Sequence, residues 1–153
     1  LPVLEYAKEL HTNEDKTYRA LALSNLIAIH QKTGIGRLSA YCGAVSAGAA
    51  AGAGIAYLCG GGYEEVIHTV VNALAIVSGM VCDGAKASCA AKIAASVDAG
   101  ILGYNMYLQG QQFYAGDGII TKGIEGTIDN VGRLGKDGMK ETNEEIIRIM
   151  IND

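Results

Sequence analysis

The sequence predicts an all-α fold, a compact bundle of Ala/Gly-rich helices joined by glycine-rich loops. Apolar residues recur at helical spacing through most of the chain, and little of it alternates with the period of two that a strand would show. Half of the 153 residues are hydrophobic, which is enough to build the core of one domain. We therefore predict a single helical domain over residues 1–153.

The first two helices follow from their end signals. Residues 1–10 form a short helix that stops near "HTNED". Asn13 can cap a second helix, and Glu14 in its first turn complements the helix dipole. Gly34 is a natural stop for this helix. Its predicted apolar side carries Tyr18, Leu21, Leu26 and Ile29.

The middle of the chain predicts three further helices. Residues 40–58 are nearly all small and uncharged, and the glycines that follow end this segment. Residues 63–81 begin with two acidic residues and continue as an apolar helix, and residues 88–108 also have a helical pattern. Gly48 and Gly52, four residues apart, are predicted to let two helices approach closely.

The C-terminal third combines a loop with two weaker helices. Residues 109–118 are polar and rich in glycine, which predicts a loop. The next helix is weakened by its glycines, each of which costs about 1 kcal/mol of helix stability relative to alanine. Its apolar positions are Ile124, Ile128, Val131 and Leu134. In the last helix, Thr142 and Glu145 have the spacing of a capping box.

Charge and composition exclude several classes of function. The net charge is −4 and no dense basic run occurs, so we expect neither nucleic acid nor an anionic membrane as a partner. Polar residues such as His68, Asn72 and Asp98 interrupt the longest apolar runs, which argues against transmembrane helices. Four cysteines without a secretory signal indicate a reducing, cytoplasmic setting and metal or redox use rather than disulfides.

The most unusual stretch is "CDGAKASC", residues 82–89, with a thiol at each end. In a continuous helix the two thiols would lie about 10.5 Å apart along the axis. Gly84 permits a turn that shortens this distance. The spacing fits neither a zinc finger nor a common ferredoxin. From the residues alone, buried core thiols and a metal site both remain open.

Two segments carry a family resemblance: "GIGRLSAYCGAVSAGAAAGAG" and "NALAIVSGMVCDGAKASCAAKIAASVDAGILGYNMYLQGQQF". They resemble the C-terminal part of iron–sulfur L-serine dehydratase alpha chains and their L-cysteine desulfidase relatives, near the serine dehydratase alpha-like branch. The likeness covers residues 20–151. It implies that the chain is the C-terminal part of a longer protein.

The resemblance implies a [4Fe-4S] cluster held by Cys42, Cys82 and Cys89. Cys59 has no counterpart in the family, and we expect it to pack. The dehydratases have a longer, proline-containing interval between their last two cysteines. The shorter "CDGAKASC" makes Cys89 the least secure of the three ligands and the desulfidase branch the nearer match.

The activity that the resemblance implies is β-elimination. L-Cysteine or L-serine would be converted to pyruvate and ammonia, with sulfide or water released. The family's substrate-carboxylate loops lie in an N-terminal region that this chain lacks, so the chain is not expected to turn over unaided. The implied partners are the amino-acid substrate, the missing N-terminal region and further copies in a homo-oligomer.

Two residues are candidates for catalytic roles. Lys86, between two of the candidate ligands, has three open interpretations: binding a substrate carboxylate, lowering the pKa of the neighbouring thiols, or lying exposed at a helix start. His68 and Glu64 are one helical turn apart and can orient each other as base and partner, although a histidine in an ordinary ion pair is the commoner case.

The remaining polar candidates are predicted to be structural. Asp83 is expected to cap the helix that follows it. His30 and His11 are expected to act at helix ends rather than in catalysis. The "GDG" at 116–118 with Lys122 is expected to be an ordinary turn.

Two alternative functions remain open at this point. The chain can be a non-catalytic helical interaction domain whose cysteines are buried. It can also be a structural module that binds zinc or iron. Iron, sulfide and zinc contents distinguish these alternatives from the lyase.

Overall fold

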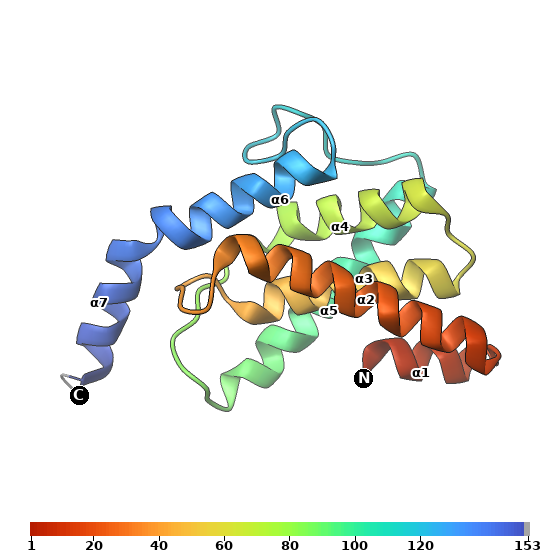
Figure 1. Cartoon of the computed structure of the whole chain (residues 1–153), viewed down its shortest axis with the longest axis horizontal. Coiled ribbons are helices and arrows are strands. Elements are labelled where there is room, and N and C mark those ends of the chain that lie inside the picture. The colour runs from red at the N-terminus through yellow and green to blue at the C-terminus, as the bar shows by residue number, and fades with distance from the viewer. Residues whose placement is uncertain (152–153) are drawn as a thin grey trace.

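A computed structural model of the chain describes residues 1–151 and consists of helices joined by loops (Figure 1). The last two residues of the predicted domain, 152–153, lie outside this range. In chain order the helices are α1 (Pro2–Glu9), α2 (Glu14–Ile35), α3 (Gly43–Leu58), α4 (Tyr63–Val77), α5 (Ser88–Leu108), α6 (Ile124–Arg133), the π-helical turn η1 (Leu134–Gly138) and α7 (Lys140–Ile151). The predicted all-α fold is confirmed.

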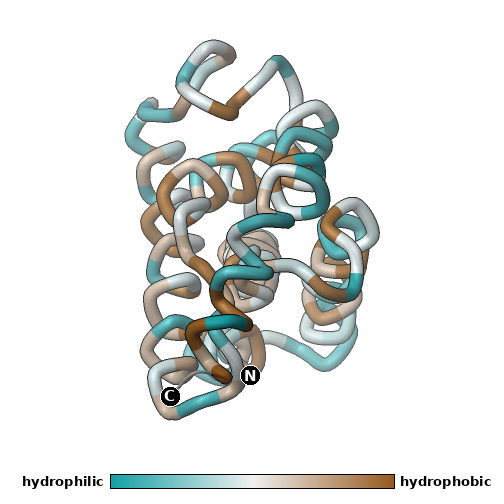
Figure 2. The backbone as a smooth tube through the Cα atoms, turned by 90° about the vertical axis from the view of Figure 1, so that its left-hand side faces the viewer, coloured by the Kyte–Doolittle hydropathy of each residue, from teal (hydrophilic) through white to brown (hydrophobic). Residues whose placement is uncertain are grey.

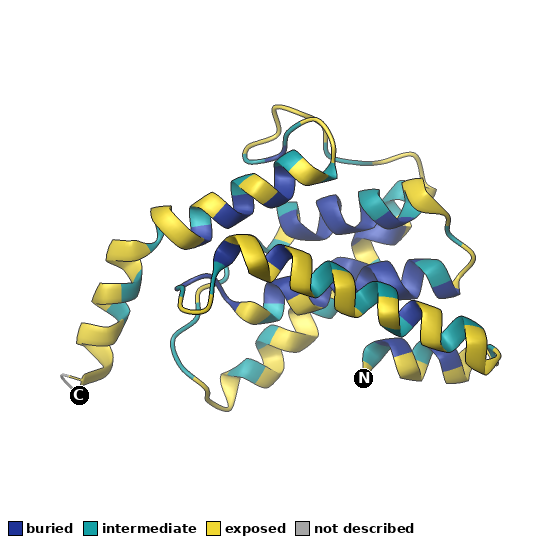
Figure 3. Cartoon of the chain, viewed as in Figure 1, coloured by how far each residue is buried: buried dark blue, intermediate teal, exposed yellow. Residues whose placement is uncertain are grey.

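Helix α3 is the centre of the molecule. It packs against α1, α2, α4 and α5, and Figure 3 shows that buried residues are concentrated in α3 and α4. Most of α3 is alanine and glycine, so its neighbours can approach its backbone. At Gly48, an added Cβ would lie 2.4 Å from the backbone of Ser96 on α5. The predicted packing role of this glycine is confirmed.

The core lies on both sides of α3. Its larger part gathers residues from α2, α3, α4 and α6 around Tyr41, Val70, Leu74 and Val131. A smaller part joins α1 and α2 to α3 through Val3, Ala20 and Leu58. Asn13 caps α2 as predicted, because its Oδ1 accepts a hydrogen bond of 2.9 Å from the backbone N–H of Lys16.

The predicted apolar side of α2 is wrong in three of its four positions. Tyr18, Leu26 and Ile29 are each more than 60% exposed, whereas Ala20 and Ile35 are buried. Apolar residues occur on several sides of α2, and in Figure 2 the outer helices carry hydrophilic and hydrophobic residues on successive turns. Because α3 presents small residues, small side chains such as Ala20 fill the contact.

Helix α4 ends at Val77, earlier than the predicted end at residue 81. Residues 78–87 then form an irregular segment that returns toward the start of α3. Its backbone pairs with residues 40–42. The N–H and C=O groups of the segment therefore form hydrogen bonds with another part of the chain instead of continuing the helix. Cys82 is therefore five residues beyond α4, and α5 begins at Ser88 as predicted.

The C-terminal helices differ from the prediction in one respect. Helix α7 begins at Lys140, so Thr142 lies inside its first turn and cannot act as an N-cap. The predicted capping box is wrong, because the chain enters α7 directly from η1. Helix α7 buries none of its residues within the described chain and extends away from the bundle in Figure 1.

Within residues 1–151, no helix has both the length and the apolar character needed to cross a membrane.

Candidate functional site

Two of the three candidate cysteines lie on paired backbone segments. The N–H of Cys42 donates to the carbonyl of Met80 at 3.1 Å, and the N–H of Cys82 donates to the carbonyl of Ala40 at 2.6 Å. Tyr41 and Val81 form the antiparallel bridge between these bonds. Segments 40 residues apart in the sequence are thereby fixed side by side.

The pairing also determines which side chains share a face. Side chains alternate across a paired segment, so the residues on either side of the bridge pair point the same way. Cys42 and Cys82 both pack on the larger core, to which Tyr41 also belongs. Diagonal neighbours of this kind lie roughly 7–8 Å apart at Cα. Cys42 is buried, and Cys82 is partly exposed.

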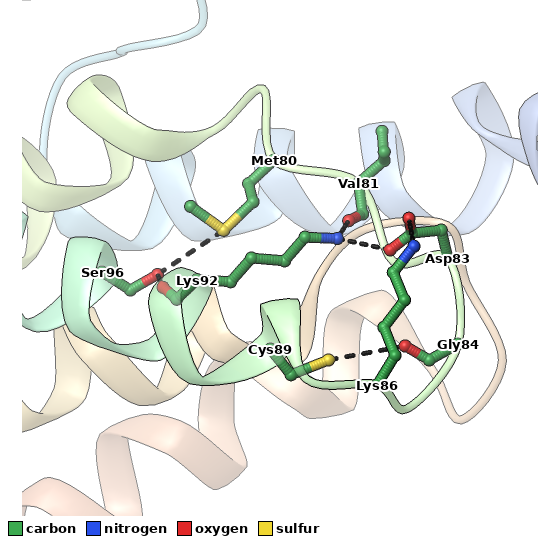
Figure 4. Close-up of polar contacts among 8 residues, drawn as sticks. All are labelled: Met80, Val81, Asp83, Gly84, Lys86, Cys89, Lys92 and Ser96. Atoms are coloured by element: carbon green, nitrogen blue, oxygen red, sulfur yellow. Dashed lines mark hydrogen bonds and ion pairs between the residues drawn. The ribbon is translucent and has the colours of Figure 1, made fainter.

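Cys89 lies in the first turn of α5 and faces the same segment. Its thiol donates to the carbonyl of Gly84 at 3.4 Å. Gly84 has a φ of +93° and provides the predicted turn within "CDGAKASC". Figure 4 shows the chain turning between Asp83 and the first turn of α5, so that the Cys89 thiol points at the Gly84 carbonyl.

Asp83 binds two lysines and does not cap α5. Lys86 and Lys92 each form an ion pair with its carboxylate, whereas the residue at the N-cap of α5 is Ala87. The predicted capping role of Asp83 is wrong, because both its oxygens are taken by ammonium groups. Hydrogen bonds from Lys86, and then from Lys92, lower the pKa of Asp83 to about 2.

Lys92 was not singled out from the sequence. It is in the second turn of α5, and its Nζ donates to the carbonyl of Val81 at 2.8 Å. Asp83 raises the pKa of Lys92, and nearby Cys42 and Cys89 add to this effect. Its ammonium group thus contacts the residues on either side of Cys82. Lys86, predicted from the sequence, is about half exposed and contacts Asp83.

His68 is not brought to the cysteines. It lies on α4 nine residues before Val77, about 13.5 Å along the helix axis from the end that leads to Cys82. Its ring stacks on Tyr107 with 4.7 Å between ring centroids. Its Nε2 lies 3.7 Å from Oε2 of Glu64. His68 is therefore too far from the candidate thiols to support its predicted role as a base at that site.

A cavity of about 220 Å³ lies beside His68, between α4 and residues 112–124. The "GDG" segment forms part of that loop, where the Asp117 carboxylate accepts a hydrogen bond of 2.6 Å from the backbone N–H of Tyr114. Gly116 and Gly118 both have positive φ. This confirms the predicted ordinary turn.

The other histidines and Cys59 lie away from the thiols. The expected helix-end role of His30 is wrong, because its Nε2 lies 2.8 Å from Glu125 Oε2 and so joins α2 to α6. His11 is in the turn after α1, and its backbone N–H donates to the carbonyl of Lys8. Cys59 is the C-cap residue of α3, at the opposite end of that helix from Cys42. It is exposed, so its expected packing role is wrong.

The candidate donor set consists of three cysteine thiols. Within residues 1–151, no three Cys, His, Asp or Glu side chains converge closely enough to hold one ion. Cys42, Cys82 and Cys89 nevertheless are all free thiols. Thiolates are the ligands that hold iron–sulfur clusters, and a cluster spans more space than one ion. The residues present therefore fit such a group by donor type.

The comparisons with known proteins match nearly the whole chain. The family model described as "Serine dehydratase alpha chain" matches residues 1–148. UPF0597 proteins are similar over nearly the full chain: one from Desulfitobacterium hafniense is 70% identical over 99% of the chain, and one from Lachnoclostridium phytofermentans is 59% identical over 99%. One from Treponema denticola is 52% identical over 100%. No solved structure matches the chain.

The chain spans about a third of the length of these relatives: 35% of the Desulfitobacterium protein and 36% of the other two. The family match covers nearly every residue, including the three cysteines that the paired segments and α5 bring to one region. The chain belongs to the serine dehydratase alpha chain family.

Proposed function

We propose that this chain is the iron–sulfur-binding part of a lyase that acts on L-cysteine or L-serine. The reaction removes the α-proton and the β-substituent, which leaves as sulfide or water, and one water then hydrolyses the resulting enamine to pyruvate and ammonia. The observation that carries the proposal is the backbone pairing that fixes Cys42 beside Cys82. The family match and the free thiol of Cys89 in the next helix support it.

In the proposal, Cys42, Cys82 and Cys89 hold a [4Fe-4S] cluster. Such a cluster, with one iron not bound by a cysteine, supplies a Lewis acid for the departing hydroxyl or thiol. The chain's residues hold the thiols in place: the paired backbone fixes two of them, and the Gly84 turn positions the third. In the proposal, Lys86, which is about half exposed, exchanges its ion pair with Asp83 for one with the substrate carboxylate.

The proposal concerns the whole protein, because this chain spans about a third of its relatives. We propose that the rest of the protein supplies the substrate-carboxylate loops and the other catalytic elements. His68 is assigned no step, since it lies beside a different cavity. Assembly into a homo-oligomer and a cytoplasmic location remain predictions.

Anaerobic purification followed by iron, sulfide and zinc analysis tests the cofactor. We expect iron and acid-labile sulfide with a visible absorbance band. Each of Cys42→Ser, Cys82→Ser and Cys89→Ser should lower the iron content. The matched control is Cys59→Ser, which should retain it because Cys59 lies at the far end of α3. Zinc as the only bound metal, or iron that survives all three substitutions, would overturn the proposal.

Activity is tested by joining the chain to the remaining region of the Desulfitobacterium hafniense protein. Pyruvate formation from L-cysteine and from L-serine should appear in the joined protein and should be lost in the three cysteine variants. A joined protein that carries the cluster but forms no pyruvate from either amino acid contradicts the lyase assignment and leaves cluster binding standing.

A further inference from the structure

Lys92 connects α5 to the segment that carries Cys82. Its Nζ donates to the carbonyl of Val81 at 2.8 Å and forms an ion pair with the carboxylate of Asp83. Figure 4 shows the side chain extending from α5 across to both groups. Val81 and Asp83 are the residues immediately before and after Cys82. One ammonium group therefore holds the chain on both sides of a candidate ligand.

The same lysine is fixed relative to Cys89. Cys89 and Lys92 are three residues apart on α5, so their side chains lie on neighbouring positions of one helix face. The backbone around Lys92 is held in turn, because Ser96 on the next turn donates from Oγ to the carbonyl of Lys92 at 2.8 Å. Ser96 is fully buried against α3. Lys92 thus projects from a well-anchored part of α5.

Lys86 contacts the same carboxylate but differs in its surroundings. The side chain of Lys92 is 20% exposed, whereas that of Lys86 is 49% exposed. Lys86 lies in the same irregular segment as Asp83, three residues away, so its ion pair joins nothing to α5. Of the two lysines, it is Lys92 that reaches from the helix to the segment, where the Cys89 thiol also contacts Gly84.

We propose that Lys92 is a positioning residue that sets Cys82 relative to Cys89 and, through the paired backbone, relative to Cys42. The role of Lys92 in holding a cluster rests on the proposed function, whereas its role in ordering residues 80–83 is independent of that function. Without the ammonium group, the Val81 carbonyl and the Asp83 carboxylate lose their attachment to α5, and the backbone pairing with residues 40–42 opens more often.

Hydrogen exchange and iron content test this proposal in the variant Lys92→Met, which keeps the length of the side chain and removes its charge. The amide of Cys82 reports directly, because it donates to the carbonyl of Ala40. We expect this amide to exchange up to about fivefold faster than in the wild type. Iron and sulfide per chain should fall after anaerobic reconstitution, and Lys92→Arg should restore part of both.

Lys86→Met is the matched control, because it removes the other lysine bound to Asp83. It should leave the exchange of the Cys82 amide and the iron content near their wild-type values. Asp83→Asn serves as the second variant and should speed exchange at Cys82 like Lys92→Met. Exchange of the α3 amides is followed in every sample, and it should stay unchanged if the effect is confined to the segment.

The two proposals fail in different ways. If the wild-type protein binds no iron but Lys92→Met still speeds exchange at Cys82, the proposed function fails and the positioning role holds. If the wild type binds iron while neither Lys92→Met nor Asp83→Asn changes exchange at Cys82 or iron content, the role of Lys92 is overturned and the proposed function stands.

Discussion

Gly52 of α3 lies against Gly100 of α5 so closely that no side chain fits between them. A Cβ added to Gly52 would lie 2.6 Å from the Cα of Gly100. Together with the contact between Gly48 and Ser96, this makes α3 and α5 touch along their backbones. Cys42 precedes α3, whereas Cys89 and Lys92 are on α5. The distance between the two helices therefore determines how closely these residues approach.

Replacing Gly52 with alanine should separate these helices. The new methyl group meets backbone atoms, which cannot rotate away, and overpacking of this kind costs about 1–3 kcal/mol. We expect the free energy of unfolding in a urea titration to fall by that amount, in spite of the better helix propensity of alanine. Gly43→Ala is the control, because nothing lies within 4 Å of its added Cβ. Equal stabilities for the two variants would contradict the close contact.

The sequence predicted the helices and the turn at Gly84 well, because these depend on local signals. Small residues from 43 to 58 mark a helix with close neighbours, and Gly84 marks the turn before α5. The irregular segment after Val77 was missed, since its backbone pairs with residues 40–42, far away in the sequence. Patterns among neighbouring residues in the sequence do not predict such a pairing.

Lys92 was missed for a related reason. It stands in an apolar helical run, and its partners Val81 and Asp83 lie 11 and 9 residues earlier, across a turn. Spacing rules cover positions three or four apart on one helix and do not reach these pairs. The buried side of α2 was mispredicted for the same reason, because which of its faces is buried depends on contacts with the small residues of α3.

Asn72 should be essential to the attachment of the 109–123 loop. It is fully buried. Its Nδ2 donates to the carbonyl of Gly103 at 3.0 Å, and its Oδ1 accepts from the backbone N–H of Phe113 at 3.1 Å. Asn72→Ala leaves both groups without a partner, at about 1–3 kcal/mol each. We expect a matching loss of stability in thermal and urea unfolding.

Asn105→Ala is the control for Asn72. Asn105 is exposed, and its side chain bonds to the carbonyl of Ile101 in the same helix. Its removal should change the free energy of unfolding by no more than about 0.5 kcal/mol. A similar, small effect for both asparagines would mean that Asn72 does not hold the loop.

Tyr104 should make the stability depend on pH in the alkaline range. Burial raises the pKa of Tyr104, and Cys59 and Glu65 add to the effect. An unfolded tyrosine loses its proton near pH 10. The folded state therefore binds this proton more tightly, and the contribution is complete below about pH 10 and is lost as the pH rises through the folded pKa.

The measurement is the ultraviolet absorbance of phenolate as the pH is raised, for the wild type and for Tyr104→Phe. The difference between the two curves is the titration of Tyr104, and its midpoint should lie above that of the same difference measured in urea. Coinciding midpoints would show that burial does not act on this hydroxyl.

Helix α7 should open independently of the bundle. It buries none of its described residues, and among the named elements it packs against η1. Its other approach is the side chain of Met150, whose Cε would lie 2.9 Å from a Cβ added at Gly84. Local opening takes little free energy where few apolar groups are buried, whereas α3 is released only by unfolding of the whole core. We expect the amides of α7 to exchange with little protection and those of α3 at the rate set by global unfolding.

Met150→Ala should reduce the protection of α7 further without changing α3. Equal protection in α3 and α7 would show that α7 is held by more than its contacts with η1 and Gly84.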